Sequence, residues 1–179
     1  RSTAVLSTGG LLALAGVATP AFAKKKSMKP NAQDAELMNA ALGLEHEGIA
    51  AYQISAESGL LSKDVLALGI LFQGHHKQHR DELAKAVRRL GGKPVEAKKQ
   101  SEYATDLEAG KLKSEADILK LALGLERGAT NAYLGMIPAL HASDLDVLVA
   151  RLAADEAVHV AMLMPAVGEK LSATGFFFG

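Results

Sequence analysis

Two stretches of this chain repeat each other about 80 residues apart, and its fold has to accommodate that repetition. Residues 41–52 read ALGLEHEGIAAY and residues 122–133 read ALGLERGATNAY, with seven of twelve positions identical. Residues 72–83 and 152–163 share the same spacing of apolar and polar side chains. Self-similarity at one fixed separation indicates a duplicated structural unit. The chain is therefore expected to contain one helical hairpin twice.

The spacing of apolar residues from Asn31 onward is typical of helices throughout, with no convincing alternating run. Ala, Leu, Glu and Lys are abundant, which favours helices, whereas aromatic residues make up only 4% of the chain. Long helices with an apolar stripe bury that stripe against one another as a bundle. We therefore expect an all-α fold with four helices, over residues 32–58, 63–90, 115–140 and 144–167.

Capping and helix-breaking residues mark the predicted helix boundaries. Asn31 is expected to cap the first helix with Asp34 as its return partner, and Gly59 and Gly91 are expected to end the first and second helices. Pro138 and Pro165 are expected to distort or end the last turns of the third and fourth helices. The expected caps of the three later helices are Ser62, Ser114 and Ser143.

The connections between the predicted helices are short, long and short. Only a few residues join the first two helices, and the same holds for the last two, so each pair is expected to be an antiparallel hairpin. Residues 91–113 separate the hairpins and are long enough to run the length of a helix. This pattern indicates a bundle with one crossover, in up-down-down-up order. An ordinary up-down bundle with a flexible middle loop is the alternative, because length alone does not separate the two.

Each predicted helix carries acidic or imidazole side chains in the middle of its apolar stripe. A buried carboxylate is costly unless it is paired, protonated or bound to a metal. A metal centre would neutralise the carboxylates and draw on all four helices, and mixed oxygen and imidazole ligands suit iron or manganese. The candidate ligands are Glu45, His76, His79, Glu126, Glu156 and His159.

Over residues 32–167 this pattern resembles the ferritin-like family of di-iron and di-manganese four-helix bundles. In that family the first and third helices each give one Glu, and the second and fourth each give Glu-x-x-His. The general look is closest to the exported ferritin-like domain proteins of bacteria. The resemblance implies a metal centre with iron or manganese, and the histidines of the second helix leave zinc or copper as alternatives. The ligands it implies, in chain order, are Glu45, His79, Glu126, Glu156 and His159.

His76 stands where the family has the Glu of the second helix, which commonly bridges the two metals. Three Glu leave a charge of −3 facing two divalent ions, which predicts an unequal di-metal site, a single metal or a different metal. A bridge through His76 is not expected, because neutral imidazole offers one nitrogen to a metal. The run from His75 to His79 is an alternative zinc or copper site. Alignment of the repeats favours His76 with His79, and His75 is expected to be exposed.

Tyr52 and Tyr133 lie at equivalent positions of the repeat, two turns beyond the single Glu of their helices. They are expected to hydrogen-bond groups around the ligands, to serve as redox neighbours of the centre, or simply to pack in the core. His46 and His141 are expected at the surface.

The N-terminal residues 1–23 have a basic first residue, an apolar middle and a small-x-small end, the pattern of a cleavable export signal. Residues 24–31 are expected to be a flexible basic linker, residues 32–167 the bundle and residues 168–179 an apolar tail. The protein is therefore expected in the periplasm or cell envelope, touching a membrane only through an uncleaved N-terminal segment. The tail can pack on the bundle or on a second subunit, which leaves a homodimer open.

Composition excludes several classes of function. With 20 basic and 20 acidic residues the formal net charge is zero, which excludes a strongly basic nucleic-acid binder. The absence of Cys excludes thiolate metal sites and Cys nucleophiles. Three functions remain open. They are a redox-active iron protein that handles oxygen, peroxide or metal under stress, a non-catalytic zinc or copper binder, and a metal-free structural or interaction bundle.

Overall fold

The computed structural model describes residues 30–175 together with residues 177 and 178. The predicted export signal and residues 24–29 of the predicted linker lie outside this part of the chain. All regular elements within it are helices, so the all-α class is confirmed for the residues described. None of the described helices combines the length and the apolarity that crossing a bilayer requires.

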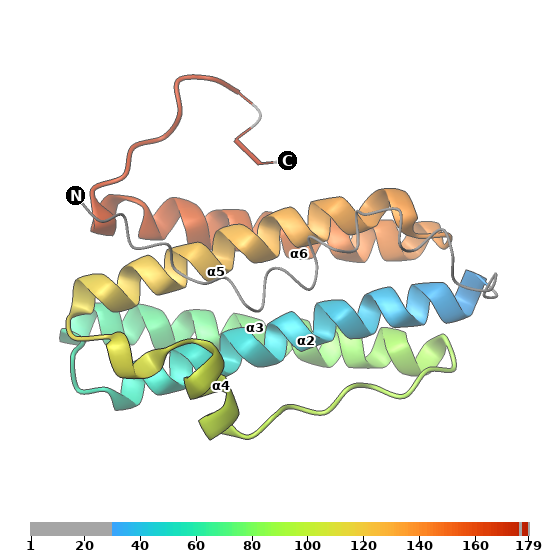
Figure 1. Ribbon diagram of the computed structural model, residues 1–179. Helices are drawn as coiled ribbons and strands as arrows, with labels where there is room; N and C mark the ends of the chain where they lie inside the picture. The colour runs from blue at the N-terminus through green and yellow to red at the C-terminus, as the bar shows by residue number, and fades with distance from the viewer. Residues whose placement is uncertain (1–29, 176, 179) are drawn as a thin grey trace.

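The bundle consists of four long helices, α2 (Pro30–Glu57), α3 (Lys63–Arg89), α5 (Glu115–Met136) and α6 (Ser143–Leu163). α2 and α3 form one antiparallel hairpin, and α5 and α6 form the other (Figure 1). α3 and α5 run in the same direction, because the chain returns along the bundle between them (Figure 1). The up-down-down-up order is confirmed, and the ordinary up-down alternative is wrong.

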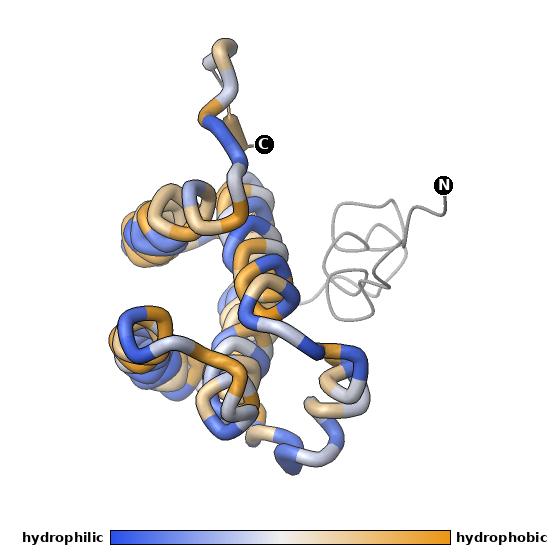
Figure 2. The backbone as a smooth tube through the Cα atoms, turned by 90° about the vertical axis from the view of Figure 1, so that its left-hand side faces the viewer, coloured by the Kyte–Doolittle hydropathy of each residue, from blue (hydrophilic) through white to orange (hydrophobic). Residues whose placement is uncertain are grey.

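The crossover contains two short helices that the apolar spacing did not predict, α4 (Gln100–Asp106) and η3 (Ala109–Lys111). α4 packs against the outer side of α2 (Figure 2), and it buries Tyr103. At its start the Glu102 carboxylate accepts a hydrogen bond from the backbone N–H of Lys99 (3.1 Å). The crossover is therefore held against the bundle rather than hanging from it.

The predicted helix-breaking residues lie where the helices end. Gly59 and Gly91 follow α2 and α3 with φ angles of 70° and 80°, a conformation that glycine adopts without strain. Ser114 caps α5 by accepting a hydrogen bond from a backbone N–H of the first turn (3.2 Å). Pro138 and Pro165 lie in the 3₁₀ turns that finish α5 and α6, η4 (Ile137–Ala139) and η5 (Pro165–Val167).

Two predicted caps are wrong. Asn31 lies inside the first turn of α2 instead of capping it, and Ser143 is the first residue of α6 rather than its cap. Asp34 is buried, and it accepts hydrogen bonds from the backbone N–H groups of His141 (3.1 Å) and Ala142 (3.2 Å). Asp34 therefore ties the start of α2 to the connection between α5 and α6.

Two apolar clusters fill the bundle, one towards each end. The first joins the N-terminal halves of α2 and α6 to the C-terminal halves of α3 and α5, and the second joins the opposite halves. Since the helices are antiparallel within each hairpin, the middle of every helix lies between the two clusters. Core residues of the first cluster include Met38, Leu83 and Val149, and those of the second include Phe72, Leu123 and Val160.

The C-terminal tail packs on its own bundle. Phe177 and Phe178 lie against the second apolar cluster, and the guanidinium of Arg127 lies 5.7 Å from the centre of the Phe177 ring. Arg127 also pairs with Glu169 (2.8 Å). Phe177 and Phe178 therefore contact the bundle of their own chain, whereas residues 168–175 are exposed.

Candidate metal centre

All six predicted ligands meet between the two apolar clusters. Each comes from the middle of its helix, at a position where the apolar stripe turns toward the bundle axis. All six are buried, with at most 7% of any one residue exposed. α2 and α5 each contribute one carboxylate, α3 contributes two imidazoles, and α6 contributes one of each. The residues are Glu45, His76, His79, Glu126, Glu156 and His159.

His76 lies between the two single carboxylates and contacts both. Its Nδ1 is 2.8 Å from Oε2 of Glu45, and its Nε2 is 3.2 Å from Oε1 of Glu126. Gly48 on α2 makes room for this ring, because a Cβ at that position would lie 3.3 Å from it. The His76 ring therefore contacts a carboxylate from each hairpin.

Glu156 also contacts both hairpins, through one imidazole from each. Its Oε1 is 3.1 Å from Nδ1 of His79, and its Oε2 is 2.9 Å from Nδ1 of His159. His159 Nδ1 is also 3.2 Å from Oε2 of Glu126. One oxygen of Glu156 thus contacts His79, and the other contacts His159. We call these two rings the outer imidazoles.

The six side chains form two overlapping groups, in each of which the candidate ligand atoms lie within 4.8 Å of one another. Glu45 and His79 complete one group, and Glu126 and His159 complete the other. We call these two groups the halves of the centre. His76 and Glu156 belong to both groups. This is the arrangement expected of two neighbouring cation positions with shared ligands.

Two tyrosines connect the hairpins above the carboxylates. The hydroxyl of Tyr52 on α2 donates to Oε1 of Glu126 on α5, and the hydroxyl of Tyr133 on α5 donates to Oε1 of Glu45 on α2. Burial, then the nearby carboxylate charge, raises the pKa of both tyrosines well above the ordinary value, so both remain protonated donors. Both the hydrogen-bonding role and the core-packing role predicted for the tyrosines are observed, because their rings also belong to the two apolar clusters.

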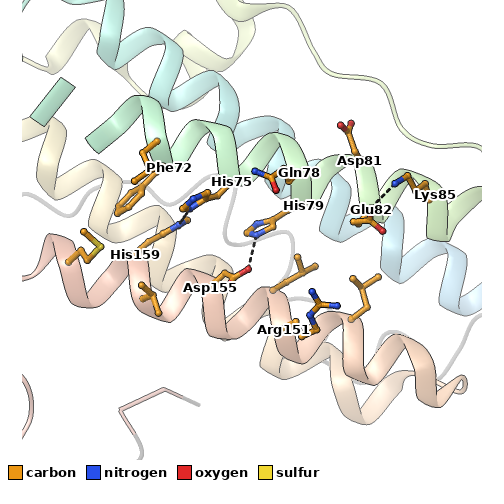
Figure 3. Close-up of a pocket in the computed structure, with 15 residues that line it drawn as sticks. Phe72, His75, Gln78, His79, Asp81, Glu82, Lys85, Arg151, Asp155 and His159 are labelled. Atoms are coloured by element: carbon orange, nitrogen blue, oxygen red, sulfur yellow. Dashed lines mark hydrogen bonds and ion pairs between the residues drawn. The ribbon is translucent and has the colours of Figure 1, made fainter. Parts of the chain in front are cut away.

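A groove of about 660 Å³ opens between α3 and α6 and reaches the centre from outside. His79 and His159 line both the groove and the centre (Figure 3). On the groove side Nε2 of His79 is 3.2 Å from Oδ2 of Asp155, and Nε2 of His159 is 2.9 Å from Nδ1 of His75. Each outer imidazole is therefore held from both of its nitrogens.

The three imidazoles of the centre hold protons strongly. Burial lowers the pKa of His79, but hydrogen bonds and charge from the neighbouring carboxylates outweigh burial and raise it to about 10. The same balance raises the pKa of His159 to about 9 and that of His76 well above its ordinary value. The metal-free centre at neutral pH therefore pairs imidazolium groups with carboxylates.

The carboxylates respond in opposite directions. Burial raises the pKa of Glu45 and Glu126, but hydrogen bonds from the imidazoles outweigh burial and lower it. For Glu156 burial prevails, and its pKa is raised. Among the described residues, none donates a hydrogen bond of ordinary geometry to the buried Oε2 of Glu156. That oxygen has only its ion pair with Nδ1 of His159, and a cation bound in the centre would supply a further partner, so the donor set fits divalent metal ions.

The spacing of residues along the helices did not predict which side chains contact the candidate ligands from the groove. His75 was expected to be exposed, yet it is only half-exposed and touches His159. Asp155 was not singled out at all. The repeat carried the missing signal, because positions 75 and 155 are 80 residues apart, as 76 and 156 are. The expected surface histidines lie outside the centre, with His141 bonded to Asp34 and His46 to the carbonyl of Val95.

Comparisons with known proteins agree with this geometry. A conserved hypothetical protein from Mycobacterium tuberculosis has a similar solved structure, with a TM-score of 0.66 and 21% sequence identity. The match covers 83% of this chain and 99% of that one, and at this identity it shows a shared fold alone. No curated protein matches the chain. The sequence signature of the ferritin-like domain matches residues 33–169, and the chain therefore belongs to the ferritin-like domain family.

Proposed function

We propose that this protein binds divalent metal ions at the buried centre, with room for two ions that share Glu156. One ion would be held by Glu45 and His79, and the other by Glu126 and His159. The carrying observation is that donors from all four helices converge in two overlapping groups. A buried cluster with this much charge is costly unless its members are paired or bound to a metal.

Iron or manganese is the proposed metal. Mixed carboxylate and imidazole donors suit these ions. Zinc and copper are the alternative metals, because an imidazole rather than a carboxylate at position 76 favours them. A bound ferrous ion would supply electrons to oxygen or peroxide. The protein groups would fix the metal ligands, keep the tyrosine hydroxyls protonated and admit small molecules through the groove between α3 and α6.

The proposed setting is the cell envelope, and the proposed role is metal handling or protection from oxidative stress. The support is the export-like pattern of residues 1–23. Secretion of the full-length precursor, followed by fractionation and N-terminal sequencing, tests the setting. Retention of the uncleaved chain in the cytoplasm would contradict it.

Metal analysis of protein purified without a histidine tag tests the binding function. We expect one or two equivalents of iron or manganese after reconstitution, and none in the double variant Glu45→Gln with Glu126→Gln. Adding ferrous iron and following oxygen consumption then separates a redox role from simple binding. Full metal uptake by the double variant would place the site elsewhere.

A metal-free structural role is the second candidate, and one observation favours it. Three imidazoles with raised pKa values and three carboxylates already pair with one another without any metal. Such a network can persist as a hydrogen-bonded polar core. A wild-type chain that takes up no iron, manganese, zinc or copper would establish this second role.

A further inference from the structure

The centre has an approximate internal symmetry that follows from the sequence repeat. Glu45 is matched by Glu126, Tyr52 by Tyr133, and His79 by His159. The contacts are matched as well, since each tyrosine crosses to the carboxylate of the other hairpin. If these pairs were the whole site, two bound ions would experience nearly the same surroundings.

The symmetry breaks at the residues that face the groove. On α6, Asp155 lies 3.2 Å from Nε2 of His79, and at the matching position on α3, His75 lies 2.9 Å from Nε2 of His159. Asp155 on α6 thus contacts a candidate ligand on α3, whereas His75 on α3 contacts a candidate ligand on α6 (Figure 3). One ligand imidazole is therefore backed by a carboxylate, and the other by a second imidazole.

The two backing groups differ in charge. A carboxylate behind an imidazole fixes the ring and raises its basicity towards a metal on the other nitrogen. His75 offers only an imidazole nitrogen to Nε2 of His159, and an imidazole carries no negative charge in any of its protonation states at ordinary pH. Nδ1 of His159 still faces the centre, but no negative charge supports the ring from behind.

The shared ligands do not remove this difference. Glu156 offers one oxygen to each half. His76 faces both halves, with Nδ1 towards Glu45 and Nε2 towards Glu126, but a neutral ring gives its lone pair to only one of them. The two halves would therefore bind a cation with unequal affinity, and the residues at 75 and 155 would decide which half binds more tightly.

We propose that His75 and Asp155 are positioning residues that rank the two halves of the centre. The half with Glu45 and His79, backed by Asp155, takes a divalent cation first, and the half with Glu126 and His159, backed by His75, takes one second and more weakly. This inference rests on the proposed metal-binding function. It adds an order of filling and names the residues that control it.

Titration of the metal-free protein with Co²⁺, followed by calorimetry and visible absorption, tests the order. We expect two unequal steps for the wild type. Since supporting partners typically change metal affinity about 10- to 100-fold, His75→Asp is expected to tighten the weaker step by about 10-fold and leave the stronger one. Asp155→Asn is expected to loosen the stronger step by about 10-fold. If the wild type takes up a single ion, Asp155→Asn weakens it and His75→Asp admits a second.

Matched variants on the same groove control for charge alone. Gln78→Asp adds a carboxylate one turn from His75, and Glu82→Gln removes one from the groove wall. Neither residue contacts a candidate ligand in the hydrogen bonds of the described chain. Circular dichroism and urea unfolding of every variant in chelator separate a change of affinity from misfolding.

Three outcomes are distinguishable. A change confined to one step, and seen only in the variants at 75 and 155, supports the order. Equal shifts of both steps, or shifts as large in Gln78→Asp and Glu82→Gln, overturn it while metal binding stands. No Co²⁺ uptake by the wild type, with no uptake of iron, manganese or zinc, overturns both the order and the proposed function.

Discussion

Position 76 is where the two repeats differ most in charge within the centre, with His76 on α3 and Glu156 on α6. An imidazolium here lies 2.8 Å from Glu45 and 3.6 Å from Glu156, and so stabilises the metal-free protein. The same cation opposes a second metal ion. The residue that keeps the empty centre stable is therefore the one that limits its loading.

His76→Glu is expected to reverse this compromise. A fourth carboxylate should tighten binding of the second Mn²⁺ ion, by at least about 10-fold if one added charge acts like a supporting ligand. The metal-free variant should unfold at lower urea concentration, because four carboxylates would then lie together. Calorimetry with Mn²⁺ and urea unfolding in chelator measure the two effects. Ser101→Glu adds a carboxylate at an exposed position of α4 outside the centre, and an equal effect there would contradict the argument.

The raised histidine pKa values predict how the metal-free protein responds to pH. A group whose pKa is higher in the folded than in the unfolded state stabilises the fold fully below its unfolded value, about 6.5. That stability is lost as pH rises through the folded values, about 9 for His159 and about 10 for His79. The urea midpoint in chelator is expected to fall between pH 6.5 and pH 10. His79→Gln should flatten this fall, and a midpoint that rises with pH would refute it.

Residue spacing predicted which side chains turn inward, but not which atoms meet. Helical periodicity fixed the inner faces of Glu45, Glu126 and Glu156, because steps of three and four define one side of a helix. Partners depend on how neighbouring helices are rotated against each other. For that reason hydrogen bonding was only one of several alternatives for Tyr52 and Tyr133, and neither tyrosine was assigned to a particular carboxylate.

At the scale of elements, the sequence predicted the four long helices and their order, and missed what holds their ends. α4 has only seven residues, too few for a periodic stripe to stand out. Asp34 looked like a capping residue because it lies three positions after Asn31. Its actual partners are more than a hundred positions away in the chain, at the turn between α5 and α6.

Asp34→Ala is expected to destabilise the fold by about 2 kcal/mol, since hydrogen bonds to charged groups contribute roughly 1.5–3 kcal/mol each and water can replace part of them. The variant loses the carboxylate that accepts from both backbone N–H groups and from the His141 ring (3.0 Å). Urea unfolding measures the loss. His141→Ala removes only the ring contact and should cost less than half as much. Equal losses in the two variants would mean that the backbone contacts contribute nothing.

At the scale of the whole molecule, the centre joins the two hairpins by polar contacts in the middle of the bundle, as Asp34 does at one end. Each of the two ligand groups takes donors from both hairpins. The tyrosine hydroxyls cross between them, and the groove separates α3 from α6 on one side. A bound cation would therefore fasten one hairpin to the other, in addition to the apolar clusters at the two ends.

Metal loading is thus expected to raise the melting temperature. A ligand at 100 times its dissociation constant stabilises the native state by about 2.7 kcal/mol. In a domain of this size, 1 kcal/mol corresponds to roughly 2–4 °C, so we expect a rise of about 5–11 °C in differential scanning calorimetry. The double variant Glu45→Gln with Glu126→Gln should show no rise, because each ligand group loses its own carboxylate. If loaded and metal-free wild type melt together while metal analysis shows full occupancy, the ions are bound outside the interface of the hairpins, and the buried centre is not their site.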